Sequence, residues 1–218
     1  MRREIDAASL APDPYPLLNS VVAPRPVLWV ATRSAGGVDN LAPFSWATVA
    51  STTPPVVCFT SAAGTQTLAN CRRTREFVLA VAPERLLREV NLTGAAFPET
   101  VSEFAAVGLT PEPAATVAAA RVAESPAVLE CRVVGEQTFG AGATASTVVY
   151  GEVLHAAVDL AVLRDGLPDL DLVRPLSRLN RDLWGTLGPL LPVTTATLDD
   201  VGDRPWDGRT RDGGPGRA

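Results

Sequence analysis

Short apolar, β-branched runs separated by turn signals predict an antiparallel β structure. Strand-like runs occupy residues 21–32, 41–51, 56–61 and 76–82. Gly36-Gly37 lies between the first two runs, so these predict a hairpin. Residues 127–139 and 145–160 alternate apolar with polar positions and predict a second hairpin. Five or six short strands with few helices are typical of a small β-barrel.

The helical signals are fewer and shorter. Residues 65–73 suit a short helix with Thr65 near its N-terminus, and residues 83–92 suit another with proline at the first position. Residues 93–127 read as loop and short helix, and residues 166–188 show no regular period. The predicted fold class is therefore mainly β with helical insertions.

The length of 218 residues fits one domain with short appendages. Residues 1–14 are polar and contain prolines, so we expect an N-terminal arm. Residues 195–218 are rich in Gly, Asp, Arg and Pro, which predicts a disordered tail. The folded domain is expected to span residues 15–194.

Composition excludes several classes of function. The chain has no lysine, so its 19 basic residues are all arginine, and Schiff-base and P-loop mechanisms are excluded. A single histidine, His155, excludes multi-histidine metal sites, and no metal is predicted. Cys58, Cys71 and Cys131 lack CxxC spacing and are interpreted as small buried hydrophobes.

Charge and hydropathy restrict the partners and the compartment. The net charge of −5 disfavours nucleic acid as the main partner. No apolar run reaches the roughly 18–20 residues of a membrane helix. The N-terminal residues carry no apolar signal-peptide core, so a cytoplasmic location is expected.

Two polar segments are candidates for a binding site. Residues 61–67 leave a buried strand, pass a glycine and enter a helix, where backbone N–H groups and hydroxyls can bind an anion. An ordinary helix cap uses the same residue types. In the second segment Asn40, Ser45, Thr48 and Ser51 alternate with apolar residues. Such a strand either lines a cleft or has one solvated face.

These residues also carry a family resemblance. The segments PYPLLNSVVAPRPVLWVAT, GGVDNLAPFSWATVASTTPPVV and TQTLANCRRTREFVLAV occur in the order typical of the flavin reductase-like family, followed by VNLTGAAFP, ESPAVLEC and YGEVLHAAVD. Over roughly residues 15–185 the chain resembles that family, whose fold is the FMN-binding split β-barrel. The resemblance implies FMN, with FAD as the alternative, bound noncovalently at a homodimer interface. It also implies flavin reduction by NAD(P)H, sometimes for a partner monooxygenase.

The resemblance assigns roles to individual positions. It implies isoalloxazine contacts, largely by backbone, along Asn40, Ala42, Pro43, Phe44 and Ser45, and contacts near the ring and ribityl chain at Ser51 and Thr52. It places Thr60, Ser61, Thr65 and Thr67 near the phosphate, although the lysine common in the family is absent here. It brings His155 toward the flavin, and it assigns Arg178 and Trp184 to the C-terminal segment beside the site.

The predicted function is that of an FMN-binding oxidoreductase in which NAD(P)H passes a hydride to flavin N5. Such chemistry needs positioning more than an acid or a base. His155 and Trp184 are the candidate catalytic residues. Two alternatives remain: an FMN-dependent oxidoreductase or oxidase acting on its own small molecule in a biosynthetic pathway, and a flavin-binding electron carrier. The sequence does not choose between NADH and NADPH.

Overall fold

The computed structural model describes residues 1–10 and 13–197. The chain divides into two units, Met1–Leu187 and Gly188–Ala218. Every described helix and strand belongs to the first unit, and residues 188–197 form neither. The prediction of a disordered tail falls mainly on residues 198–218, which lie outside the described part of the chain.

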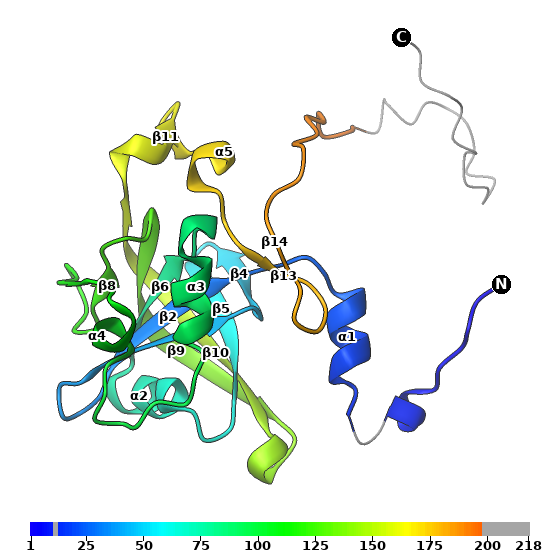
Figure 1. Ribbon diagram of the computed structural model, residues 1–218, viewed down its shortest axis with the longest axis horizontal. Coiled ribbons are helices and arrows are strands. Elements are labelled where there is room, and N and C mark those ends of the chain that lie inside the picture. Colours follow the sequence, from blue (N-terminus) through cyan, green and yellow to red (C-terminus); the bar gives the residue numbers. More distant parts are fainter. Residues whose placement is uncertain (11–12, 198–218) are drawn as a thin grey trace. The chain divides into compact units, whose positions relative to one another are not determined.

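The helices are short (Figure 1). The α-helices are α1 (Tyr15–Val21), α2 (Gln66–Thr74), α3 (Leu87–Leu92), α4 (Glu103–Val107) and α5 (Leu170–Val173). The 3-10 helices are η1 (Ala7–Leu10), η2 (Glu84–Leu86), η3 (Gly142–Thr144) and η4 (Leu160–Val162). α2 follows the predicted span closely, whereas the predicted helix 83–92 consists of η2 followed by α3.

Seven strands form the main sheet, in the order β3-β2-β6-β9-β10-β5-β4, and each neighbouring pair is antiparallel. These strands are β2 (Leu28–Arg33), β3 (Asp39–Phe44), β4 (Ala47–Thr52), β5 (Pro55–Ala62), β6 (Glu76–Val81), β9 (Ala127–Phe139) and β10 (Ser146–Val158). Two-residue strands form three small sheets: β1 (Arg25–Pro26) with β13 (Ser177–Arg178) and β14 (Trp184–Gly185), β7 (Pro111–Glu112) with β8 (Arg121–Val122), and β11 (Leu163–Arg164) with β12 (Leu167–Pro168).

The order of the strands forces the sheet to curl. β3 and β4 lie at opposite edges of the sheet, yet only Ser45 and Trp46 separate them in the chain. The edges of a flat seven-stranded sheet are roughly 29 Å apart. Phe44 and Ala47 are three residues apart and can be separated by at most about 11 Å. The two edges therefore meet at this corner, and the sheet forms a split β-barrel.

Two apolar clusters lie on opposite faces of the central strands. On β2, Trp29 and Ala31 belong to one cluster and Val30 to the other, as expected for side chains that alternate across a strand. The first cluster includes residues of α3 and α4, and the second packs Leu68 and Cys71 of α2 against Phe59 and Phe77. Burial on both faces explains the continuous apolar run at 76–82.

The structure confirms both predicted hairpins. β2 pairs with β3 through the turn at Gly36-Gly37, and β9 pairs with β10 over almost their whole length. The prediction of one strand over 41–51 is wrong, because β3 pairs with β2 whereas β4 pairs with β5. The run 21–32 is also not one strand, since α1 occupies its first residue and β1 and β2 follow.

Candidate functional site

The site forms around the corner between β3 and β4. Two cavities adjoin this corner, and Ser45 lines both of them. The Trp46 cavity, of about 580 Å³, lies between α1, the corner and β5. The Trp184 cavity, of about 370 Å³, lies between α1, the end of β3 and β14. Both volumes are typical of small-molecule sites.

The Trp184 cavity joins two predicted segments that are distant in sequence. Pro43, Phe44 and Ser45 line it together with Arg178 and Trp184. The Arg178 guanidinium carbon lies 4.7 Å from the centroid of the Trp184 ring. β13 pairs with both β14 and β1, which holds the C-terminal segment beside the barrel. The structure therefore brings five of the predicted site residues to one cavity.

The Trp46 cavity adds a residue that the sequence prediction did not include. Trp46 lines the cavity with the predicted Ser45 and Thr60. Its indole Nε1 donates a hydrogen bond to Asn19 Oδ1 at 3.0 Å, and its ring lies 6.1 Å from that of Tyr15. Trp46 directly follows the segment NLAPFS, and a tryptophan next to that segment was the signal available in the sequence.

The remaining phosphate-side candidates gather at the start of α2. Ser61 Oγ and Thr65 Oγ1 are hydrogen-bonded at 2.7 Å, and Thr65 Oγ1 accepts from the Leu68 backbone N–H at 3.2 Å. Asn40 Nδ2 donates to Thr67 Oγ1 at 3.3 Å. Thr65 is thus the helix cap, as one interpretation held. The first N–H groups of a helix have no partner within it, which leaves those of Gln66 and Thr67 for an anion.

Within one chain, three of the predicted site residues lie far from the start of α2. Ser51 pairs with Val56 at the far end of β5, and Thr52 follows it, so both lie roughly 17 Å along the sheet from Ser61. His155 is exposed and pairs with Glu130, whereas Ser61 pairs with Thr147 of the same strand β10. The separation of His155 from Thr147 along β10 is roughly 26 Å. The polar residues that alternate over 40–51 do not share one strand face, because β3 ends at Phe44 and β4 begins at Ala47.

Burial keeps the described cysteines as thiols, and it raises the pKa of Cys58, which lines the Trp46 cavity. Burial raises the pKa of Cys71 and of Cys131 to about 12, so both thiols stay protonated. Burial also raises the pKa of Glu103, whose carboxylate accepts a hydrogen bond from the Leu41 N–H at 2.8 Å. Within residues 1–10 and 13–197, no three His, Cys, Asp or Glu side chains are grouped as metal ligands. None of the described helices has the length and apolarity to cross a membrane.

A buried arginine connects the segments that line both cavities. Arg25 is only 6% exposed. Its Nη1 donates to the carbonyl oxygens of Asn19 and Val22 at 2.8 and 2.6 Å, and its Nη2 donates to that of Leu179 at 2.7 Å. It therefore ties the end of α1 to the segment between β13 and β14.

Known proteins share this architecture. Residues 21–174 match the model of the flavin reductase like domain. An uncharacterized protein of Halalkalibacterium halodurans, BH2278, is 34% identical over 191 residues, which cover 84% of this chain and 91% of that protein. The crystal structure of nitrilotriacetate monooxygenase component B from Bacillus cereus superposes with a TM-score of 0.84 at 26% identity, covering 88% of this chain and 99% of that one.

A third comparison concerns the fold alone. The 2-nitrobenzoate 2-nitroreductase NbaA of Pseudomonas fluorescens is 24% identical, with a TM-score of 0.82 over 90% of this chain and 98% of that one. The match to the flavin reductase like domain covers residues 21–174, which is more than half of the chain, and this extent establishes the family. The chain belongs to the flavin reductase-like family, and its fold is the split β-barrel of that family.

Proposed function

We propose that the protein is an FMN-binding oxidoreductase that reduces its flavin with NAD(P)H. The observation that carries the proposal is the convergence of residues 43–45 with Arg178 and Trp184 on one cavity, in a chain of the flavin reductase-like family. The supply of reduced flavin to a monooxygenase is an extension supported by the likeness to nitrilotriacetate monooxygenase component B.

The residues present fit a flavin mononucleotide. An isoalloxazine needs flat apolar walls, which Phe44, Trp46 and Trp184 offer around the corner. A phosphate needs donors, which the start of α2 offers through backbone N–H groups and the hydroxyls of Ser61, Thr65 and Thr67. In this proposal these donors take the place of the lysine that is common in the family and absent from this chain.

The chain's own part in the reaction is to bind and to orient. Bound FMN supplies a ring that accepts a hydride at N5. The start of α2 holds the phosphate, and residues 43–45 at the end of β3 lie beside the ring. Trp184 and Phe44 restrict water and align the donor's ring, which lowers the entropic cost of hydride transfer. None of these roles needs a titrating side chain.

The proposal includes a twofold homodimer. β4 is an edge strand, and Val49 on it is 64% exposed. Apolar side chains beside the Trp46 cavity are exposed as well, including Leu18 of α1 and Val22, the residue after this helix. An exposed apolar edge strand favours association. A second copy that covers β4 and α1 would close the site and bring its own Ser51 or Thr52 near the flavin.

The function is tested by binding and then by reduction. The protein is expected to bind FMN more tightly than riboflavin, because the phosphate has dedicated donors. Anaerobic mixing of the FMN-loaded protein with NADH or NADPH is expected to bleach the flavin absorbance in a stopped-flow instrument. Thr67→Ala is expected to weaken FMN binding by about 1–2 kcal/mol, because it removes one hydrogen-bond donor to the charged phosphate. Thr67→Ser retains the hydroxyl and is the control.

Equal affinity for FMN and riboflavin would remove the phosphate site from the proposal. Failure of both nicotinamides to reduce bound FMN within minutes at millimolar concentration would reject the reductase function. The FMN-dependent oxidoreductase or oxidase with its own substrate would then be the better interpretation.

The dimer is tested by a charge on the exposed strand. Light scattering of the wild type at micromolar concentration is expected to give twice the 22.8 kDa of one chain. Val49→Asp is expected to give the mass of one chain and weaker FMN binding, because an unpaired carboxylate would be buried in the interface. Leu160→Asp, in η4 and 83% exposed, is the control that leaves the dimer intact. A monomeric, flavin-loaded wild type would contradict the assembly.

A further inference from the structure

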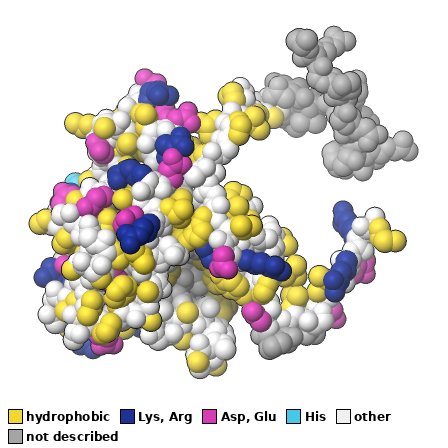
Figure 2. Space-filling view, in the orientation of Figure 1, with side chains coloured by type: hydrophobic (Ala, Val, Ile, Leu, Met, Phe, Trp, Pro, Cys, Tyr) yellow, Lys and Arg dark blue, Asp and Glu magenta, His cyan; other side chains and the backbone are white. Residues whose placement is uncertain are grey.

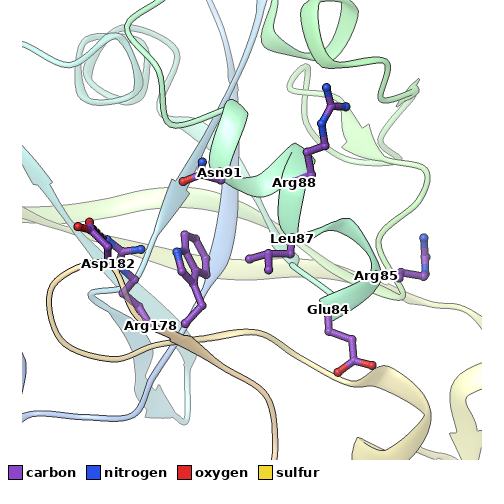
Figure 3. A pocket seen from close by; sticks show the side chains of 8 residues that line it. Glu84, Arg85, Leu87, Arg88, Asn91, Arg178 and Asp182 are labelled. Atoms are coloured by element: carbon purple, nitrogen blue, oxygen red, sulfur yellow. Dashed lines mark ion pairs between the residues drawn. The ribbon is translucent and has the colours of Figure 1, made fainter.

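A third cavity extends the candidate site toward α3. This α3 cavity has a volume of about 610 Å³ and lies between η2, α3 and the β13–β14 segment (Figure 3). It shares Asn91, Arg178 and Trp184 with the Trp184 cavity. A ligand whose ring occupies the Trp184 cavity can therefore continue past these three side chains into the α3 cavity.

The shared wall presents donors suited to an anion. In Figure 3, Asn91 and Leu87 project from α3 toward the β13–β14 segment, where Arg178 lies. The Arg178 guanidinium lies against the Trp184 ring, so its planar fork is held in place. Such a fork binds carboxylate and phosphate oxygens in pairs.

The acidic residues nearby do not neutralise this wall. Glu84 is ion-paired with Arg174. Asp182 is the carboxylate beside Arg178, with Oδ1 3.5 Å from Nη2, and its side chain is fully exposed. An ion pair of that length with an exposed partner is weak and easily displaced. Asp182 thus occupies the position that an anion of a ligand would take.

Further positive charge comes from α3. Arg88 lines the cavity and points away from Arg178 in Figure 3. Among the described residues its guanidinium forms no hydrogen bond or ion pair, whereas Arg85 donates to the Glu124 carbonyl. Figure 2 shows arginine and apolar side chains side by side over α3. The charge of Arg88 acts over distance and is screened by salt.

We propose that the α3 cavity binds an anionic group of the substrate that exchanges electrons with the flavin. Arg178 and the Asn91 amide contact this group, Arg88 adds to the attraction, and Asp182 competes with it. The substrate class is a planar ring joined to a phosphate or a carboxylate. This inference rests on the proposed function, since the ring must lie beside the flavin.

The test compares a charged and an uncharged hydride donor on the FMN-loaded protein. For Arg178→Gln, KM for NADH is expected to rise by tenfold or more, whereas KM for uncharged 1-benzyl-1,4-dihydronicotinamide rises several times less. Arg88→Gln is expected to raise KM for NADH about threefold and to reduce its salt dependence. Asp182→Asn removes the competitor and is expected to lower KM for NADH, a result that a merely structural Arg178 would not give.

Arg164→Gln is the matched control, because Arg164 carries the same charge in the β11–β12 hairpin, pairs with Asp169 and lines none of the three cavities. Benzoate, read by its effect on the flavin spectrum, is the second arm. One outcome is that benzoate binds the wild type but not Arg178→Gln, while NADH does not reduce the flavin. This outcome would assign the anion site to a carboxylic acid substrate and would reject only NADH as the electron donor. Reduction by NADH with an unchanged KM in Arg178→Gln overturns the anion site and leaves the reductase function intact.

Discussion

Glu130→Ala is expected to lower the free energy of unfolding by about 3–5 kcal/mol, the usual result of breaking a buried ion pair. Glu130 has no exposed surface on β9. Its carboxylate accepts hydrogen bonds from the Ala115 and Thr116 N–H groups, the Thr116 hydroxyl and the Arg121 guanidinium. The variant leaves the largely buried Arg121 with only its longer contact to Glu112, at 3.5 Å, and frees the loop before β8. Urea denaturation at a fixed protein concentration measures the loss.

The same group predicts a dependence on pH. Burial alone raises the pKa of Glu130, but the hydrogen bonds from Thr116, Ala115 and Arg121 outweigh it and lower this pKa from 4.5 to about 2. A lowered pKa in the folded state stabilises the protein above pH 4.5. This contribution, about 3 kcal/mol, disappears as the pH falls from 4.5 to about 2. The stability difference between wild type and Glu130→Ala should therefore narrow over that range.

Glu136→Ala is the control on the same strand. Glu136 pairs with Arg72 at 3.1 Å, and both side chains are well exposed, at 34% and 48%. Exposed pairs contribute about 1 kcal/mol or less. A loss for Glu130→Ala no larger than for Glu136→Ala, or a difference that does not change with pH, would show that the buried carboxylate does not stabilise the fold.

Arg25→Ala is expected to release the two segments that line the candidate site. The variant removes the donors to the carbonyl oxygens of Asn19, Val22 and Leu179. Charged hydrogen bonds contribute about 1.5–3 kcal/mol each and are not additive. A local loss of about 3 kcal/mol increases amide hydrogen exchange on the order of a hundredfold. We expect this increase in residues 15–22 and 177–185, with FMN affinity about tenfold lower.

Arg33→Ala is the matched control, because Arg33 is a half-exposed arginine on β2 whose contact with Asp39 is 3.8 Å long. Its removal should change neither the exchange of α1 nor FMN affinity. If Arg25→Ala left hydrogen exchange in residues 15–22 and 177–185 as in the wild type, Arg25 would not be the residue that anchors them.

Local patterns were sufficient for much of the fold. The turn at Gly36-Gly37, the alternation over 127–139 and 145–160, and the cap at Thr65 each depend on neighbours in sequence, and the structure agrees with all three. The break in 41–51 escaped this reasoning because Ser45 and Trp46 look like strand residues. Only the pairing of β3 with β2 and of β4 with β5, both decided at long range, shows that the chain crosses from one sheet edge to the other.

The candidate site divides in the same way. Residues 43–45 and the polar start of α2 are contiguous motifs, so the sequence alone marked them and the family they belong to. The meeting of Arg178 and Trp184 with residues 43–45, more than 130 residues earlier in the chain, depends on curling of the sheet and on the β1–β13 pairing. The exposure of His155, the burial of Arg25 and the α3 cavity also depend on packing between distant segments. Periodicity and turn chemistry act between near neighbours and determine the elements, whereas long-range strand pairing decides which side chains share a cavity.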